Sequence, residues 1–339
     1  MPKIDLTNEE VEILNGGMGS AITHYGSEKY DIYNDPLWSA RLLLTDPDFV
    51  KQIHVRFLSA GSTIIEANTY QASIEGLQRD CKQRTRTEAQ QIIQSAVTVA
   101  RDAVQQFLST CDDDDDGFHR QIYVAGSIGP YGVVLHDGSE YSGSYLSTVS
   151  EQIVIDYYCG QIETLLSSDV DLLKFDTIPA LREIELIATA LRVAKGRNSQ
   201  CPVVVSVACQ SDTSVCAGDA IESVVDAVLR NDDVITAMGI NCTAPEFVTS
   251  LLTKIRQRAP TLPVFLYPNK GEHWDPVTKE YTSNRELKPI ASCISEWLTL
   301  GNIRAIGGCC RVLPDDIKEI AAACRTAMSP SRMQPEAKK

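Results

Sequence analysis

The chain has 339 residues, a formal net charge of −14 and a sequence pI near 4.8. Nucleic acids and anionic membranes are bound through basic surfaces, so this charge argues against both as partners and favours a small-molecule ligand. The hydrophobic share of 43% and the charged share of 22% are those of an ordinary globular protein, which excludes wholesale disorder and fibrous repeats.

The amino-terminal stretch MPKIDLTNEEVEIL has neither the basic start nor the apolar core of a secretory signal. No later run reaches the ~18 apolar residues of a membrane span. The 11 cysteines are odd in number and lack the dense spacing of a disulfide-stapled module, which indicates reduced thiols. We therefore expect a cytoplasmic protein that does not associate with membranes.

Short runs rich in Val and Ile alternate along the chain with segments of helical period. The runs predict eight strands, at 11–14, 62–67, 121–126, 171–175, 202–208, 234–240, 263–267 and 303–307. Helices are predicted near 46–60, 87–108, 144–166, 180–194, 218–230, 245–256, 285–300 and 314–327. The first of them has Asp46 or Thr45 as its N-cap, Pro47 in its first turn and Gly61 after its end.

Strand followed by helix, eight times over, is the element order of a (β/α)8 barrel. We expect an α/β protein with a single TIM-type barrel over residues 1–328, with loop insertions, and a disordered C-terminal tail over residues 329–339. The alternative is an open doubly wound sheet, which often carries a glycine-rich phosphate loop. The sequence GGMG at 16–19 does not match that GxGxxG pattern.

In such barrels the catalytic residues follow the carboxyl ends of the strands. Polar or glycine-rich sequences do so here, at NGGMG (15–19), EANTYQ (66–71), DTIP (176–179), NCT (241–243) and GGCCR (307–311). Cys242, Cys309 and Cys310 therefore lie at one rim, after the sixth and eighth strands. Adjacent residues on an extended strand point to opposite faces, so we expect Gly307 and Gly308 to adopt unusual backbone angles that turn both sulfurs to one side.

Three thiolates without a fourth protein ligand describe a zinc site with one open position, which is the form of a catalytic site. Soft sulfur ligands favour zinc over magnesium or calcium. Spacing alone leaves equally open the alternative that Cys309 and Cys310 are buried thiols beside an unrelated Cys242, because cysteine is often buried. A disulfide between the adjacent cysteines is disfavoured by strain and by a reducing compartment.

The motifs NCT, GGCCR and GGMGS together resemble the homocysteine S-methyltransferase family, whose members are zinc-dependent (β/α)8 barrels. The resemblance covers nearly the whole chain. Segments similar to the family's, in the family's order, are EANTYQAS (66–73), AGSIGPYG (125–132), DGSEYSG (137–143), DTIPALREIE (176–185), YPNKGEHWD (267–275) and GGCCRVLPDDI (307–317). Several of them resemble the branch that uses S-methylmethionine or S-adenosylmethionine as methyl donor, rather than the betaine and folate branches.

The resemblance implies that Cys242, Cys309 and Cys310 hold Zn2+ and form the catalytic centre, with the substrate thiol as the fourth ligand. It implies a transferase of methionine biosynthesis, which moves a methyl group from S-methylmethionine to homocysteine, with S-adenosylmethionine as the less favoured donor. Metal coordination would deprotonate the acceptor thiol, whose pKa is otherwise about 8.5. The thiolate would attack the methyl carbon of the sulfonium, so orientation of the two reactants is the main contribution to the rate.

The chain departs from the family pattern where the acceptor's amino group is held. Asn15 replaces an aspartate before the two glycines, and Asp176 replaces a glutamate in the ETIP-like segment. The substitutions leave three readings open: weaker homocysteine binding, a different acceptor such as selenocysteine or another small thiol, and a non-catalytic zinc- or ligand-binding barrel. A structural alternative is that Asn15 shapes the turn before Gly16 and that Asp176 caps the next helix.

Further substrate-binding residues are predicted around these positions. Tyr70, Tyr131 and Trp274 could face the donor sulfonium through cation–π attraction, or could be rim aromatics packed on loops. Asn68 and Asn269 could supply polar contacts or be turn residues. The predicted substrate-binding set is Asn15, Gly16, Gly17, Asn68, Tyr70, Tyr131, Asp176, Asn241, Asn269 and Trp274.

Overall fold

The protein is described here by a computed structural model that covers residues 3–7, 10–26, 29–110, 121–194, 200–275, 280–283 and 287–329. At 273–275 and 280 the description is limited to the backbone. Residues 330–339 of the predicted C-terminal tail lie outside the described residues, so the disorder of that tail stays a prediction.

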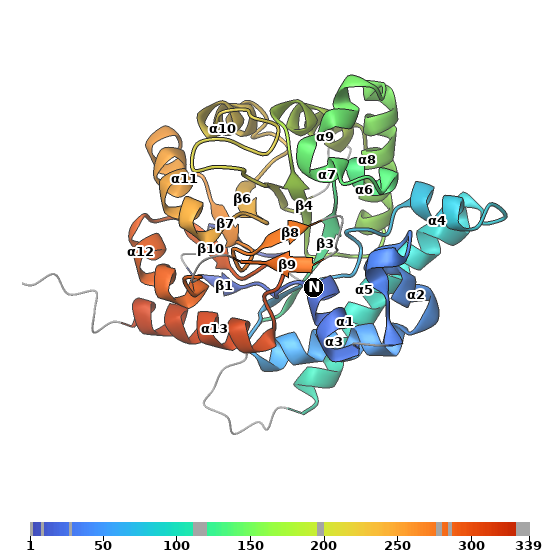
Figure 1. Cartoon of the computed structure of the whole chain (residues 1–339), viewed down its shortest axis with the longest axis horizontal. Helices are drawn as coiled ribbons and strands as arrows, with labels where there is room; N and C mark the ends of the chain where they lie inside the picture. Colours follow the sequence, from blue (N-terminus) through green and yellow to red (C-terminus); the bar gives the residue numbers. More distant parts are fainter. Residues whose placement is uncertain are drawn as a thin grey trace, which may run out of the picture.

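Eight parallel strands form a closed barrel (Figure 1). They are β1 (Glu12–Ile13), β2 (Ile64–Glu66), β3 (Tyr123–Ile128), β4 (Leu172–Ile178), β5 (Val203–Val207), β6 (Ala237–Asn241), β7 (Val264–Tyr267) and β10 (Ile303–Ile306). Their order around the barrel is β1-β10-β7-β6-β5-β4-β3-β2. A parallel bridge between Leu14, which directly follows β1, and Ile64 of β2 closes the ring. The predicted single (β/α)8 barrel is confirmed, and the open doubly wound sheet is excluded.

Helices surround the barrel on its outside (Figure 1). They are α3 (Pro47–Ser59), α5 (Arg86–Leu108), α8 (Glu151–Leu166), α9 (Leu181–Ala194), α10 (Ile221–Arg230), α11 (Pro245–Arg258), α12 (Ile294–Thr299) and α13 (Pro314–Met328). The predicted signals of α3 are confirmed: the Asp46 side chain accepts the Phe49 N–H at 3.1 Å, Pro47 opens the helix, and Gly61 follows it with φ +109°. Within the described ranges, no helix has the length and apolar character needed to cross a bilayer.

Additional short elements were not predicted. They are the helices α1 (Met18–Gly26), α2 (Arg41–Thr45), α4 (Ile74–Asp80), α6 (Gly132–Leu135) and α7 (Ser139–Ser142), the 3₁₀ turns η2 (Ile32–Asn34) and η3 (Trp38–Ala40), and the antiparallel hairpin of β8 (His273–Asp275) and β9 (Glu280–Thr282). Each is too short for a hydrophobic period to emerge, which is why the sequence pattern misses them. The 3₁₀ turns η4 (Ser144–Ser147) and η6 (Ile290–Cys293) are found where the helices near 144–166 and 285–300 were predicted to begin. Apart from η6, all of these elements follow the carboxyl ends of strands and build the active-site side of the barrel.

Three strands run further at their carboxyl ends than predicted, and β3 is one of them, since it continues past Gly126 to Ile128. The apolar runs end at Phe175 and Ile240, yet β4 continues to Ile178 and β6 to Asn241. The interior of the barrel is apolar in its lower part, where Leu172, Val204 and Phe265 belong to one buried cluster. Above that level the inward side chains are polar, so polar residues within a strand were mistaken for its end.

A buried histidine makes the stability of the fold pH-dependent. His54 lies on the inner face of α3 with an exposed fraction of 0%, and neither ring nitrogen has a partner among the described residues. Burial lowers the pKa of His54 from 6.5 to about 4. The unfolded chain therefore takes up a proton here below about pH 6.5, whereas the folded chain does so only near pH 4, and stability falls as the pH falls through this window.

The unfolding free energy of the wild type is expected to fall as the pH is lowered from 6.5 to 4. In the variant His54→Leu we expect this fall to be smaller by about 2–3 kcal/mol. Leucine fits the same apolar surroundings and does not titrate. The measurement is urea unfolding of both proteins at several pH values in this range. Parallel pH profiles for the two proteins would contradict the assignment.

Candidate metal centre and the polar interior beside it

Three thiols meet at the mouth of the barrel. Cys242 Sγ lies 2.9 Å from Cys309 Sγ and 3.4 Å from Cys310 Sγ, and all three atoms lie within 4.8 Å of one another. Each of the three residues is half-buried. The convergence predicted from the sequence is therefore present, and we call these residues the cysteine triad. The alternative of two buried thiols beside an unrelated third does not fit this geometry.

The segment that carries Cys309 and Cys310 is held by backbone hydrogen bonds from neighbouring strand ends. Gly308 N donates to Asn15 O at 3.2 Å, Cys309 N donates to Pro268 O at 2.8 Å, and Lys270 N donates to Cys310 O at 3.2 Å. These bonds tie the segment to the ends of both β1 and β7. The triad is thus placed by the closed barrel rather than by a free loop.

The explanation predicted for the two glycines is wrong. Neither Gly307 nor Gly308 has a positive φ; instead Arg311 adopts φ +68° directly after the cysteines. The glycines are needed for close packing, because a Cβ on Gly307 would lie 2.5 Å from Leu14 Cβ and one on Gly308 would lie 2.2 Å from Val312 Cγ1. The absence of side chains lets the segment approach β1 and lets its own turn close.

Cys242 is held in a left-handed backbone conformation with φ +47°, which is uncommon for a residue with a Cβ. Its neighbours fix it there. Asn241 Oδ1 accepts the Thr177 N–H at 2.8 Å, and Asn241 Nδ2 donates to Thr177 Oγ1 at 2.8 Å. On the other side, Thr243 Oγ1 accepts the Cys209 N–H at 2.9 Å. Such strain persists at functional sites when the surroundings hold it in place.

The donor set of the triad fits a soft metal ion with one open position. Tetrahedral zinc with Zn–S bonds of about 2.3 Å places its sulfurs about 3.8 Å apart, so Cys242 and Cys309 would separate by less than about 1 Å on binding. Near the triad, Tyr141 Oη lies 3.9 Å from Cys242 Sγ. Hydrogen bonds from Cys242, Cys309 and Tyr281 hold the pKa of the Cys310 thiol well below its ordinary value, which favours a thiolate.

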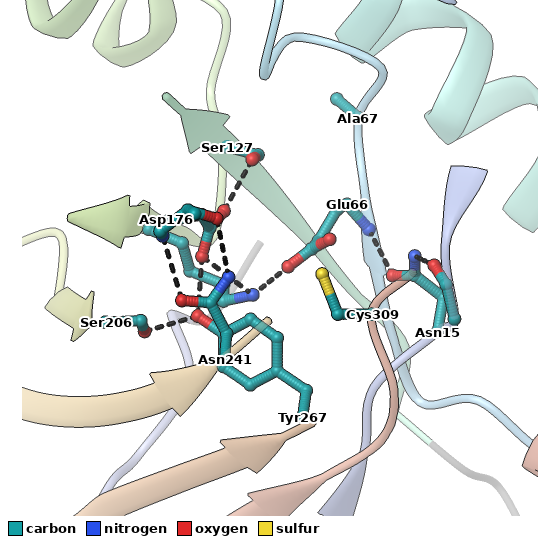
Figure 2. A network of polar contacts seen from close by, with 12 residues as sticks. Asn15, Glu66, Ala67, Ser127, Asp176, Ser206, Asn241, Tyr267 and Cys309 are labelled. Carbon is teal, nitrogen blue, oxygen red and sulfur yellow. Dashed lines mark hydrogen bonds and ion pairs between the residues drawn. The ribbon is translucent and has the colours of Figure 1, made fainter. Parts of the chain in front are cut away.

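Figure 2 shows a polar cluster in the upper interior of the barrel, which we call the interior cluster. Lys174 Nζ contacts Glu66 Oε1, lies 3.4 Å from Asp176 Oδ1 and sits 3.8 Å above the Tyr267 ring. Asp176 also accepts hydrogen bonds of 2.5 Å from Ser127 Oγ and from Tyr267 Oη. Two carboxylates and an aromatic face are the surroundings of a charged ammonium, although burial lowers the pKa of Lys174.

Asn15 lies beside this cluster but faces the backbone. Its Oδ1 accepts the Glu66 N–H at 2.8 Å, and its Nδ2 donates to Gly16 O at 2.8 Å. The residue is 2% exposed. The substrate-binding role of Asn15 stays a prediction, and its amide already has one backbone partner at each end. This geometry favours the structural alternative, in which Asn15 shapes the turn before Gly16.

The other predicted substrate-binding residues lie around the rim. Gly16 and Gly17 pack under the cysteine segment, where a Cβ would lie 2.2 Å from Val312 O and 2.7 Å from Cys309 O respectively. Asn68 is bonded to Ser39 through both ends of its amide, and Asn269 Oδ1 accepts the Gly271 N–H at 2.8 Å. These contacts show that all four residues stabilise the local structure. The predicted substrate-binding roles of Gly16, Gly17, Asn68 and Asn269 stay predictions.

The three predicted aromatics differ in position. Burial raises the pKa of Tyr70, and Glu140, Cys242 and Cys309 raise it further, which places Tyr70 within electrostatic reach of the triad. Tyr131 packs at 5.5 Å against the ring of Tyr157, away from any described triad contact. Trp274 belongs to β8, and its side chain lies outside the described residues.

Sequence reasoning missed Lys174, Tyr267 and Tyr141. A usable signal existed for Lys174, because a lysine in the middle of the apolar run DLLKF must find counter-charges if the strand is buried. Tyr267 and Tyr141 gave no such signal, since a tyrosine at a strand end or in a loop is equally common on a surface. The pairing of Lys174 with Glu66 spans 108 positions and depends on the barrel topology.

A comparison with protein families decides which family this site belongs to. The model of the homocysteine S-methyltransferase family matches residues 12–324. The chain belongs to this family. It is 33% identical over 313 residues to a selenocysteine Se-methyltransferase of Brassica oleracea var. italica, with 91% of this chain and 87% of the relative covered.

Two further similarities fit this family. The chain is 32% identical over 315 residues to homocysteine S-methyltransferase 2 of Arabidopsis thaliana, with 91% of each chain covered. Its fold is similar to the metallated form of the homocysteine methyltransferase MmuM from Escherichia coli, with a TM-score of 0.77, 27% identity and coverage of 94% of this chain and 97% of that chain. The protein is therefore a methyltransferase of a family whose named members act on homocysteine or selenocysteine.

Proposed function

We propose that this family member transfers a methyl group from a sulfonium donor, S-methylmethionine in preference to S-adenosylmethionine, to the thiolate of homocysteine, and that Zn2+ held by Cys242, Cys309 and Cys310 is its cofactor. The observation that carries the proposal is the convergence of three thiols within 4.8 Å at the barrel mouth. Three soft donors with an open fourth position suit a metal that binds a substrate thiol.

Zinc, when bound by the triad, supplies the positive charge that keeps an acceptor thiol deprotonated at neutral pH. The triad residues fix where that sulfur lies, and the backbone bonds at Gly308, Cys309 and Cys310 hold them in place. A new bond forms between the acceptor sulfur and the methyl carbon while the donor S–CH3 bond breaks. Its electron pair stays on the donor sulfur, which leaves as a neutral thioether, so no side chain has to protonate a leaving group.

The test is methionine formation by reduced, zinc-loaded protein from homocysteine with each sulfonium donor in parallel. We expect faster turnover with S-methylmethionine. A faster reaction with S-adenosylmethionine would correct the donor preference. Silence with both donors despite bound zinc would refute homocysteine methylation from these donors and leave another acceptor or the non-catalytic reading.

Selenocysteine is the second acceptor candidate, because the chain is 33% identical over 313 residues to a protein named selenocysteine Se-methyltransferase. A selenol is more acidic than a thiol, and selenocysteine is one methylene shorter than homocysteine. The same assay with selenocysteine as acceptor distinguishes the two: a higher kcat/KM for selenocysteine would replace homocysteine as the proposed substrate.

A further inference from the structure

The interior cluster next to the cysteine triad has a net charge that favours a ligand cation. Lys174 contributes one positive charge, and Glu66 and Asp176 contribute two negative charges. The lysine side chain has an exposed fraction of 0%, so a ligand anion cannot reach it. One negative charge is therefore left over, in a region of low dielectric where a cation is attracted.

Asp176 is not the group that offers this charge to a ligand. Its Oδ2 accepts from Ser127 Oγ, and its Oδ1 accepts from Tyr267 Oη and faces Lys174 Nζ. The side chain is 5% exposed. Both carboxylate oxygens are thus already engaged within the barrel, and a ligand would have to break one of these contacts to bind.

Glu66 has the oxygen that is available. Its Oε1 contacts Lys174 Nζ, whereas Oε2 has no partner among the described residues. Its side chain is 22% exposed, against 0% for Lys174 and 5% for Asp176. The Glu66 backbone is fixed by the hydrogen bond to Asn15 Oδ1, and Lys174 holds the carboxylate itself. The Glu66 carboxylate is therefore held in place through its backbone and Oε1, while Oε2 stays available to a ligand.

Glu66 is linked through Asn15 to the segment that carries two residues of the triad. Asn15 bonds to Glu66 through its side chain and to Gly308, the neighbour of Cys309, through its backbone carbonyl. Figure 2 draws Cys309 beside the carboxylate of Glu66. Burial lowers the pKa of Lys174, and Asp176 and then Cys309 act in the opposite direction, which places the lysine within electrostatic reach of the Cys309 thiol.

We infer that Glu66 Oε2 binds the α-ammonium group of the acceptor, so that the acceptor is an amino acid carrying a thiol or selenol, and that Lys174 positions this carboxylate. The choice of ligand rests on the proposed function. Glu66 thus provides the negative charge for the ammonium group. Asn15 does not provide it, because its amide is neutral and bonded to the backbone. Thiols of the same length without an amino group lack this contact.

The test compares two thioethers that differ by the ammonium group alone, methionine and 4-(methylthio)butanoate, by calorimetric titration of the full chain. We expect the wild type to bind methionine more tightly, and Glu66→Gln to weaken methionine binding by roughly 10- to 150-fold, the range for a charge-assisted hydrogen bond. Binding of 4-(methylthio)butanoate is expected to change less than about threefold, because that ligand makes no contact with the removed charge.

Two further variants serve as controls. Glu222→Gln removes a carboxylate from an exposed ion pair with Lys254 on the outer helices and is expected to bind both ligands as the wild type does. Glu66→Asp keeps the charge and is expected to restore part of the preference for methionine. Circular dichroism of each variant confirms folding, and the amide of Glu66→Gln still offers an oxygen to Lys174.

Equal affinity of the wild type for the two thioethers, or an equal loss of both in Glu66→Gln, would overturn the assignment. Binding requires no turnover, so the two proposals fail separately. Discrimination without methyl transfer would refute the proposed function and leave the ammonium site standing. Methyl transfer to homocysteine, without discrimination between the two thioethers, would support the proposed function and refute the ammonium site.

Discussion

Replacing Cys310 with alanine is expected to lower the zinc affinity of the protein at least about 100-fold and to reduce methyl transfer by a similar or larger factor. Removal of a partner that only orients a metal ligand already costs about 10- to 100-fold, and Cys310 supplies one of three sulfurs within 4.8 Å. Two thiols do not retain zinc against a competing chelator as three do. The measurement is zinc content after dialysis against a weak chelator, together with the rate of methionine formation.

The matched control is Cys81→Ala. Cys81 is a half-buried free cysteine at the end of α4 and does not belong to the triad. Full zinc content and rate are expected in this variant, since it removes a thiol without removing a ligand. Full zinc retention in Cys310→Ala, with the rate unchanged, would end the assignment of Cys310 as a ligand and with it the proposed metal centre.

Replacing Lys174 with methionine is expected to destabilise the fold by about 3–5 kcal/mol, the range for removing one partner from a buried ion pair. Methionine fills a similar volume, so the effect does not come from a cavity. It comes from Glu66 and Asp176, which would face each other without a counter-charge, with Asp176 at 5% exposure. Urea unfolding near neutral pH measures the loss.

A double-mutant cycle with Asp176→Asn tests the cause. If the two charges stabilise each other, the double variant is less destabilised than the sum of the single variants, by about 0.5–3 kcal/mol. Strict additivity would show that Lys174 and Asp176 are not coupled, and would leave Glu66 as the charged partner of Lys174. Because Glu66 stays unchanged throughout, the cycle measures the coupling between Lys174 and Asp176 separately from the contact between Lys174 and Glu66.

Much of the fold could be predicted from the sequence because its main signals are local. An apolar run of four to seven residues followed by a helical period occurs eight times, and the ends of α3 are marked by Asp46, Pro47 and Gly61. The inserted elements could not be predicted, since the hairpin of β8 and β9 depends on where it lies over the barrel mouth. Strand ends were misplaced where the barrel interior is polar, as at Asp176.

The site was predictable to the extent that barrel topology fixes it. The carboxyl ends of strands share one rim, so Cys242 and the pair at 309 and 310 had to lie on the same side. Side-chain pairing was not predictable, because Glu66 and Lys174 meet only through the curvature of the closed sheet. For Asn15 the sequence left open both a contact with the acceptor and a role in the turn before Gly16, and it could not name the Glu66 N–H as the partner of the side chain.

The placement of the triad has a consequence for the order of folding. Its sulfurs come from residue 242 and from residues 309 and 310, on either side of β7, and the second group is anchored to the end of β1. Until the last strand has inserted, Cys242 is apart from the adjacent Cys309 and Cys310, so the three sulfurs do not meet. If the proposed metal needs all three sulfurs, its tight uptake is expected to be a late step that reports on ring closure during refolding.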